Sequence, residues 1–150
     1  MAKKNADTNY NTNLASEYLM MSLLCRAGKD AYLSLGNKKG VDIIVKTEKG
    51  AICIIEVKGV NGYNWPISIN GKINRASNLF YALISFNRKI NEITLMPDFW
   101  LIPSEKLLKN VEGKELEKGR TINLSTKYIW DNYNYYKNTF RFLDNYLNNN

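Results

Sequence analysis

Two apolar runs decide the fold: GVDIIV at positions 40–45 and AICIIEVK at positions 51–58, joined by TEKG at 47–50. A glycine-containing turn between two short, β-branched apolar segments predicts a β-hairpin. Because side chains alternate along a strand, Glu56 and Lys58 share one face of the second strand and the apolar residues between them share the other. Burying charged groups among such strands is costly without a compensating partner. The acids and the lysine of this hairpin therefore mark a candidate site.

Upstream of the hairpin, the sequence predicts a helix from Leu14 to about Ala27, closed by Gly28. Residues 1–12 are expected to form a flexible leader, and Asn11-Thr12-Asn13 offer helix caps. On a helical wheel, the apolar side chains of one stripe are predicted to pack on the sheet: Leu14, Tyr18, Met21 and Cys25, widened by Leu24.

Glu17 falls at the flank of that packing face, where an acid is unusual. Two interpretations are open for it: a contribution to the candidate site, or a helix-surface acid paired with a lysine or arginine.

Further elements are expected on both sides of the hairpin. A strand is predicted for Lys29–Leu35, and the later predictions are a strand (or a helix) at Leu79–Phe86, a strand at Pro97–Pro103, a helix at Glu105–Val111 capped by Ser104, and a helical tail at Tyr133–Leu147. Together they predict a single α/β domain over residues 1–150. Phe80, Tyr81, Phe99 and Trp100 are expected in its core.

The composition limits the possible chemistry. The chain has 150 residues, a net charge of +7, no histidine and two cysteines. Zinc sites and histidine catalysis are thereby excluded, so a general base must be a carboxylate, a lysine or a metal-bound water. The positive charge favours a polyanionic partner.

The composition also predicts a cytoplasmic protein without a membrane partner. No apolar run approaches the length of a membrane span, and no secretion signal is visible at the start. Cys25 and Cys53 lie in apolar sequence and are expected to be reduced core residues rather than a disulfide.

A helix with an acid, a strand beginning with Asp42, a hairpin and a strand with Glu56-x-Lys58 follow in this order, which resembles the PD-(D/E)XK nuclease superfamily. That superfamily includes restriction endonucleases and Holliday-junction resolvases. The resemblance implies a restriction-endonuclease-like α/β fold, in which helices flank a mixed central β-sheet. It also implies Asp42, Glu56 and Lys58 as the catalytic motif and Glu17 as the acid of the first helix. Val41 stands where the family's nominal proline would be.

This resemblance implies a metal-dependent endonuclease that hydrolyses phosphodiester bonds in duplex or branched DNA. Mg²⁺ or Mn²⁺ would be held by Asp42, Glu56 and the carbonyl of Val57, because hard cations prefer oxygen ligands. Lys58 would orient the attacking water or neutralise charge in the transition state, and Glu17 would hold a metal-bound water or a second cation.

Five residues are candidates for nucleic-acid contact. Lys38 and Lys39 lie in the loop ahead of Asp42, with a solvated turn as the alternative. The others follow the motif lysine, with loop packing as the alternative: Tyr63, Trp65 and Lys72.

Two other functions remain open at this stage: a DNA-binding or assembly protein that kept the fold without the chemistry, and an RNase or nuclease toxin that acts on RNA. A homodimer is expected if both DNA strands are cut, because one small domain offers one cleavage centre.

Overall fold

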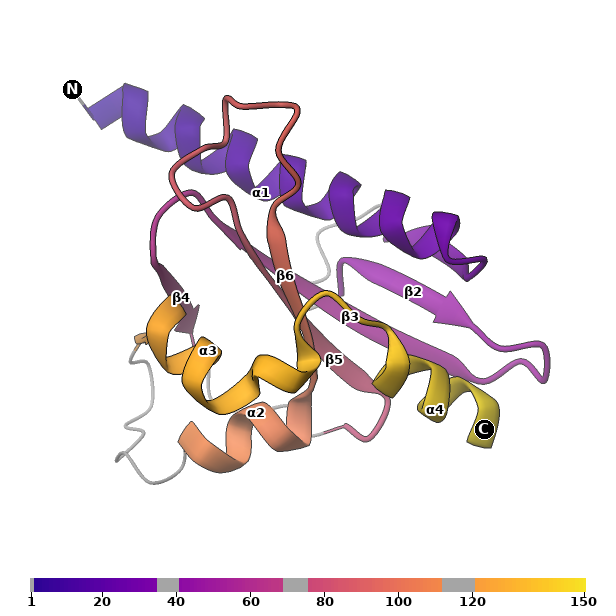
Figure 1. The fold of residues 1–150 in the computed structure, drawn as a ribbon. Helices are drawn as coiled ribbons and strands as arrows, with labels where there is room; N and C mark the ends of the chain where they lie inside the picture. The colour runs from indigo at the N-terminus through magenta and orange to yellow at the C-terminus, as the bar shows by residue number, and fades with distance from the viewer. Residues whose placement is uncertain (1, 35–40, 69–75, 112–120) are drawn as a thin grey trace.

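The computed structural model describes residues 2–34, 41–68, 76–111 and 121–150 (Figure 1). The elements in chain order are α1 (Ala2–Arg26), β1 (Asp30–Leu33), β2 (Ile43–Lys46), β3 (Ile52–Val60), β4 (Asn64–Ser68), β5 (Leu79–Ser85), β6 (Asp98–Pro103), α2 (Ser104–Val111), β7 (Thr121–Ser125), α3 (Thr126–Tyr133), η1 (Asn134–Tyr136) and α4 (Arg141–Asn149).

Within the described residues, the central sheet has five strands in the order β1-β2-β3-β5-β6. Its first three strands are antiparallel, β3 and β5 are parallel, and β5 and β6 are antiparallel. β4 pairs with β7 in a separate antiparallel ribbon. Helices flank this sheet in Figure 1, so the predicted α/β class with a mixed central sheet is confirmed. The expected hairpin is the pair β2–β3.

Two apolar clusters lie on the two faces of the sheet. Met20 and Leu24 of α1 and Leu143 of α4 pack with the side chains of β3 that point toward them. Leu107 of α2 and Ile129 of α3 belong to the second cluster, on the opposite face. The parallel pair β3–β5 is therefore covered on both sides, as parallel strands require.

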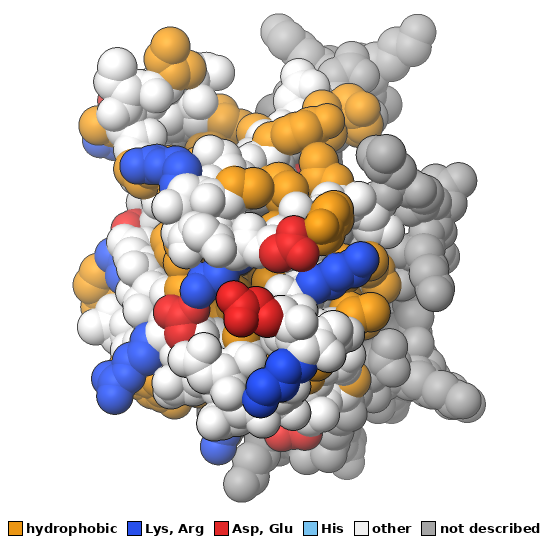
Figure 2. All heavy atoms as spheres, turned by 90° about the vertical axis from the view of Figure 1, so that its right-hand side faces the viewer, with side chains coloured by type: hydrophobic (Ala, Val, Ile, Leu, Met, Phe, Trp, Pro, Cys, Tyr) orange, Lys and Arg blue, Asp and Glu red, His pale blue; other side chains and the backbone are white. Residues whose placement is uncertain are grey.

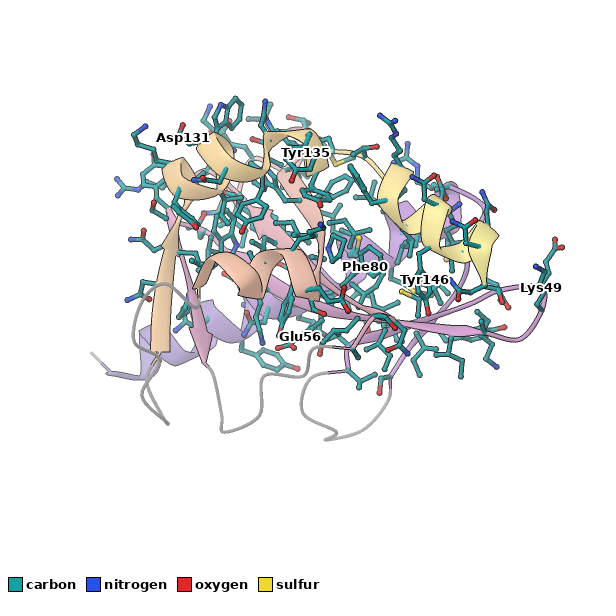
Figure 3. The ribbon with its side chains drawn as sticks, turned by 90° about the horizontal axis from the view of Figure 1, so that it is seen from below. Lys49, Glu56, Phe80, Asp131, Tyr135 and Tyr146 are labelled. Carbon is teal, nitrogen blue, oxygen red and sulfur yellow. The ribbon has the colours of Figure 1, made fainter. Side chains whose placement is uncertain are left out.

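The burial patterns of β3 and β5 follow from the apolar clusters on the two faces of the sheet. In β3, buried and less buried residues alternate, whereas every residue of β5 is buried. β5 lies between β3 and β6 and has apolar layers above and below, so its continuous apolar sequence is a strand and not the alternative helix. Phe80 of β5 contacts Tyr146 of α4 with ring centroids 6.0 Å apart (Figure 3). The four aromatic residues predicted to be core are buried: Phe80, Tyr81, Phe99 and Trp100.

The first helix differs from its prediction in extent. α1 begins at Ala2, so the backbone is helical where a flexible leader over residues 1–12 and a helix start near Leu14 were predicted. Asn11-Thr12-Asn13 lie inside the helix and do not cap it. Thr12 is buried, and its carbonyl accepts a hydrogen bond from the Ser16 hydroxyl at 2.7 Å. Packing against the sheet therefore continues upstream of the predicted start.

The first helix also differs from its prediction in orientation. The side chains that face the sheet are Thr12, Ser16, Met20 and Leu24. Of the predicted packing stripe, Leu24 is buried as predicted and Met21 is half-buried against the core, but Leu14, Tyr18 and Cys25 are exposed. The prediction was wrong for these three because the sheet accepts the small residues Thr12 and Ser16 where α1 crosses it. Cys25 and Cys53 are both free, as expected, but only Cys53 is buried.

Gly59 of β3 is the reason that α1 packs on the sheet through small residues at this crossing. A Cβ at position 59 would lie 1.7 Å from Ser16 Oγ and 2.5 Å from Ser16 Cβ. Only glycine allows α1 to approach β3 this closely, and only a small residue at position 16 fits against it.

The C-terminal part is also different from the single helical tail that was predicted. α3 ends at Tyr133, the short helix η1 follows, and α4 begins at Arg141. Asn138, between them, has a φ of 51° and donates its backbone N–H to the Phe99 carbonyl. Asn138, in the left-handed region, interrupts the helical backbone where the chain bonds to β6, and α4 then packs on the same face of the sheet as α1.

No helix among the described residues combines the length and the apolar character needed to cross a membrane.

Candidate active site at the open edge of β3

β3 is longer than its pairing with β2. The register of the hairpin runs from Ile43↔Ile55 to Lys46↔Ile52, whereas β3 continues to Val60. Residues 56–60 therefore have β5 along one edge and, among the described residues, no strand along the other. This open edge is where the charged residues of the hairpin gather.

Asp42 covers the first part of the open edge. Its backbone N–H donates to the Ile55 carbonyl at 3.2 Å, and its Oδ2 accepts a hydrogen bond from the Val57 N–H at 2.6 Å. Burial raises the pKa of Asp42, and the negative charge of Glu56 adds to the rise. The Val57 hydrogen bond and the charge of Lys58 oppose it. The carboxylate is thus fixed in place but only partly compensated.

Glu56 and Lys58 share one face of β3, as the alternation predicts. Lys58 Nζ lies 2.7 Å from Glu56 Oε1, and 16% of the Glu56 side chain and 36% of the Lys58 side chain are exposed. Tyr81 is adjacent to Glu56 on β5 and hydrogen-bonds to its carboxylate. Burial, with the charge and hydrogen bond of Glu56, raises the pKa of Tyr81 to about 12, so the phenol stays a donor. Figure 3 shows Glu56 on the sheet from below.

Glu17 reaches the same place from α1. Burial raises its pKa, the charge of Asp42 raises it further, and the charge of Lys58 lowers it. Glu17, Asp42 and Lys58 therefore lie within electrostatic reach of one another. Glu17 lies about a quarter turn around the helix from the buried stripe, since successive residues differ by 100°.

These groups surround a cavity of about 250 Å³. Its walls come from α1, from the start of β2, from the open edge of β3 and from β4: Asn13, Glu17, Asp42, Val57, Lys58, Gly59, Val60, Trp65 and Pro66. Of the four predicted catalytic residues, the structure brings three to this cavity. The fourth, Glu56, does not line it but is joined to it through Lys58.

The Val57 peptide faces the cavity edge. The N–H and C=O of one strand residue point to the same side, and the Val57 N–H donates to Asp42. Its carbonyl therefore points toward the Asp42 side and away from β5. The carboxylates of Asp42 and Glu56 and the carbonyl of Val57 are hard oxygen donors, which Mg²⁺ and Mn²⁺ prefer as ligands. In the part of the chain that is described, no three Asp, Glu, His or Cys side chains lie together as a ready metal cage.

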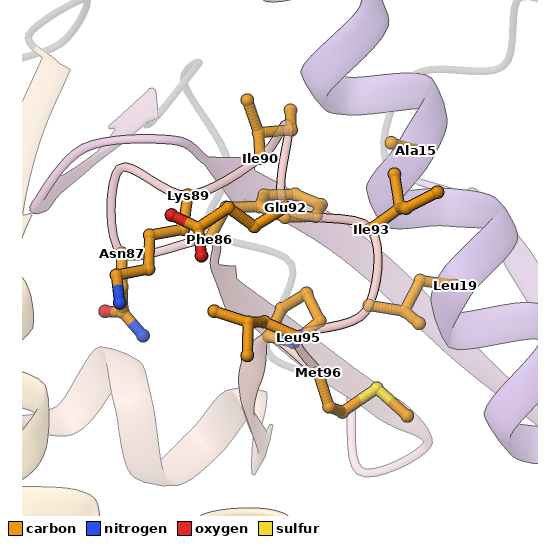
Figure 4. A pocket seen from close by; sticks show the side chains of 11 residues that line it. Ala15, Leu19, Phe86, Asn87, Lys89, Ile90, Glu92, Ile93, Leu95 and Met96 are labelled. Carbon is orange, nitrogen blue, oxygen red and sulfur yellow. The ribbon is translucent and has the colours of Figure 1, made fainter.

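Two larger hollows differ from this cavity in the chemistry of their walls. One, of about 400 Å³, lies between α1 and the β5–β6 loop and is mainly apolar (Figure 4). The other, of about 470 Å³, lies between the hairpin tip and α4. Figure 2 shows acidic and basic side chains interspersed on that side of the molecule, and Lys29 pairs with Asp144 there. The opposite charges at that hollow neutralise one another.

The predicted nucleic-acid contacts have different outcomes. Trp65 is fully buried and its Nε1–H donates to the Ile84 carbonyl at 3.1 Å, so a DNA contact through its ring was the wrong prediction. Tyr63 is 47% exposed, and the Arg88 guanidinium lies 4.5 Å from its ring centroid. Lys38, Lys39 and Lys72 lie outside the described residues.

Sequence reasoning missed three contributors: Asn13 in the cavity wall, Gly59 beneath α1 and Tyr81 beside Glu56. Gly59 directly follows the motif lysine, and a glycine inside a strand signals a close approach. Asn13 and Tyr81 carry no such signal, because their proximity depends on how α1 and β5 dock.

No protein-family model matches the chain, and neither does any curated protein. Among solved structures, a bacterial homing endonuclease is similar to it, with 14% sequence identity and a TM-score of 0.46. The match covers 77% of this chain and 76% of that chain.

Proposed function

We propose that this chain is a metal-dependent endonuclease that hydrolyses phosphodiester bonds in DNA. One observation carries the proposal: Glu17, Asp42 and Lys58 line a single cavity at the edge of β3 where the Val57 N–H bonds to Asp42, and Glu56 forms an ion pair with Lys58. Carboxylates and an amine around a common cavity suit a divalent cation beside a phosphodiester.

The donor set fits Mg²⁺ or Mn²⁺. Asp42, Glu56 and the Val57 carbonyl would hold the ion, and water would complete its coordination because the described part of the chain has no third acid in place. The raised pKa of Asp42 indicates negative charge that its neighbours only partly compensate, which favours a cation there. Such an ion would supply Lewis-acid polarisation of a phosphoryl oxygen.

The chain's own groups have distinct tasks. The Lys58 ammonium, held at Glu56, stabilises negative charge that develops on the scissile phosphate. Glu17 accepts a hydrogen bond from the attacking water on the α1 side of the cavity, and its raised pKa suits proton transfer nearer neutral pH. The Val57 N–H orients the Asp42 carboxylate.

The test is cleavage of supercoiled plasmid, a four-way DNA junction and a structured RNA, each with Mg²⁺, with Mn²⁺ and with EDTA. We expect DNA cleavage that requires metal and is lost in Asp42→Ala and Lys58→Ala. Lys127→Ala is the matched control, because Lys127 forms an exposed ion pair with Asp131 away from the cavity. Cutting that survives both site variants would reject this assignment.

A second candidate is a DNA-binding or assembly protein without catalysis. The Lys58–Glu56 ion pair favours it, because Lys58 already neutralises the carboxylate that a metal would need. This candidate predicts binding that weakens steeply with salt and is unaffected by metal. Cleavage of RNA but not of DNA in the same assay would instead favour a ribonuclease.

The proposed setting is the cytoplasm, where the free Cys25 and Cys53 would stay reduced.

A further inference from the structure

An exposed cation–π pair lies just beyond the end of β3. The guanidinium of Arg88, in the loop between β5 and β6, lies 4.5 Å from the ring centroid of Tyr63, in the turn between β3 and β4. Both side chains are exposed. Because β3 and β5 are parallel, the segments that follow them emerge at the same end of the sheet (Figure 1). The pair therefore joins two segments that are distant in the sequence.

This pair adjoins the cavity of the candidate active site. Val60 and Trp65, which flank the turn in the chain, both line that cavity. Lys58 precedes the turn residue Asn61 by three positions, a distance of about 10 Å along an extended strand. Phosphates of one DNA strand follow one another at about 3.4 Å along the helix axis. A strand held at Lys58 can therefore reach the turn within a few nucleotides.

The backbone of the β5–β6 loop holds Arg88 in place in an uncommon conformation. Asn87 and Arg88 have φ values of 52° and 62°, in the left-handed region that residues with a Cβ rarely adopt. The Asn61 carbonyl accepts a hydrogen bond from the Arg88 N–H, and Asn61 Oδ1 accepts one from the Ile90 N–H at 3.3 Å. Asn87 Nδ2 donates to Asp98 at 3.1 Å. Such backbone persists where its surroundings fix it, and it is frequent at binding sites.

The side chain of Arg88 has no countercharge. None of the ion pairs between described residues includes it. Lys137 provides the contrast, because its ammonium also lies over an aromatic ring, that of Trp130, but pairs with Asp98. An aromatic face holds a guanidinium without occupying its five N–H donors. Arg88 therefore presents a fixed positive charge, with its donors available to an anion.

We propose that Arg88, held by the ring of Tyr63, binds a backbone phosphate of the DNA strand that enters the candidate active site. A guanidinium binds phosphate oxygens through two parallel N–H donors, which makes phosphate a fitting ligand. The net charge of +7 favours a polyanion over an isolated carboxylate. This inference rests on the proposed function for the nature of the ligand, DNA, but not for the hydrolysis.

Salt-dependent DNA binding tests this assignment. The affinity of the full chain for a short fluorescein-labelled DNA duplex is measured by fluorescence anisotropy in EDTA, over a range of salt concentrations. Arg88→Gln should weaken binding about 5- to 10-fold at about 0.1 M salt. It should also reduce the slope of log affinity against log salt by about 1, because one phosphate contact is lost. Arg88→Lys keeps the charge and should retain the wild-type slope.

Lys49→Ala is the matched control. Lys49 is also an exposed cation, but it lies at the hairpin tip, at the opposite end of β3 from the turn (Figure 3). Its loss should leave the affinity and the slope near those of the wild type.

Three results would overturn the proposal: no DNA binding by the wild type, an Arg88→Gln variant with the wild-type slope, or an equal loss in Lys49→Ala. Arg88-dependent binding by a chain that cuts no DNA with Mg²⁺ or Mn²⁺ would instead reject the proposed hydrolysis and support this contact.

Variants of Tyr63 test the ring without changing the left-handed loop. Tyr63→Phe keeps the aromatic face and should bind DNA like the wild type. Tyr63→Ala removes the face that holds the guanidinium and should weaken binding about 2- to 5-fold, the scale of an exposed cation–π contact. Its salt slope should stay unchanged, because the charge of Arg88 remains. Equal affinities of the Phe and Ala variants would contradict the role given to the ring.

Discussion

Asp42 and Asp98 are both partly buried aspartates at strand starts, yet their surroundings have opposite effects. Burial tends to raise the pKa of Asp98, but hydrogen bonds from Lys137, Asn87 and Asn138, with the charge of Lys137, outweigh it and lower the pKa. Burial dominates at Asp42, and its pKa is raised. One carboxylate is saturated with donors, and the other is not.

The regions around Asp98 and Asp42 also differ in how completely their charges are compensated. At Asp98, Lys137 Nζ lies 3.0 Å from Oδ1 and 4.0 Å from the centroid of the Trp130 ring. These two contacts of Lys137 connect β6 to α3. Near Asp42, Lys58 is the shared cation: Glu17 and Asp42 line the cavity with it, and Glu56 pairs with it outside the cavity wall. A compensated charge stabilises the fold, whereas an undercompensated one beside a cavity is typical of a binding or catalytic site.

The largest expected difference between the two aspartates is in activity. Asp42→Asn should lower cleavage on the order of 100- to 1,000-fold, because the proposed metal site would lose one carboxylate ligand. Asp98→Asn, measured below its unfolding temperature, should cut at close to the wild-type rate. Metal-dependent plasmid cleavage by both variants measures this difference. An equal loss of cleavage rate in Asp42→Asn and Asp98→Asn would contradict the assignment of Asp42, and not Asp98, to the active site.

The next effect concerns the close approach of α1 to the site. Gly59→Ala should lower the free energy of unfolding by about 1–3 kcal/mol, because the added Cβ meets Ser16. Ser16→Gly should restore part of this loss in the double variant. Urea denaturation measures both changes. Gly62→Ala is the control, because a Cβ there has open space around it. Equal effects at the two glycines would argue against the tight contact.

The ion pair between Asp98 and Lys137 should also stabilise the fold. Asp98→Asn leaves the Lys137 ammonium without its countercharge and should cost about 2 kcal/mol at neutral pH. The loss should shrink as the pH falls through the lowered pKa of Asp98, because the wild-type carboxylate is then protonated as well. Thermal unfolding across acidic and neutral pH measures it. Asp131→Asn, which removes an exposed pair, should change stability by less than about 1 kcal/mol.

The smallest expected effect is an increase in stability, for the variant Glu17→Gln. The pKa of Glu17 is raised, so its ionised form is less favourable in the folded chain, and wild-type stability falls as the pH rises through the window between the ordinary and the raised pKa. Glu17→Gln should therefore stabilise the metal-free chain at neutral pH by a few tenths of a kcal/mol, about the scale of partly exposed charges. The gain should vanish at acidic pH. A destabilised Glu17→Gln at neutral pH would mean that Glu17 has a compensating partner.

The hairpin and the strand positions of its charged residues were predictable from the sequence. Alternation along β3 separates Glu56 and Lys58 from the buried side chains, and the glycine-containing turn pairs β3 with β2. Both are local properties that the order of residues sets directly. The strand β6 was predictable for the same reason, whereas the sequence left a helix open for β5 until its central, fully buried position decided the matter.

The docking of these elements was not predictable in the same way. The sequence favoured the larger stripe of α1 for packing, yet the sheet accepts Thr12 and Ser16 because Gly59 leaves room only for small groups. Likewise Trp65, a candidate for nucleic-acid contact or loop packing, fills the second core cluster because β4 pairs with β7 from far along the chain.

The sequence by itself determined the hairpin, the alternation that sets Glu56 and Lys58 on one face of a strand, and the positive charge of the chain, because each depends on neighbouring residues or on composition. Only the tertiary structure decided that Glu17, Asp42 and Lys58 line one cavity, that Tyr81 contacts Glu56, and that α1 turns Leu14 and Tyr18 outward. Those arrangements depend on which surfaces fit when distant segments pack, and residue order does not encode that fit locally.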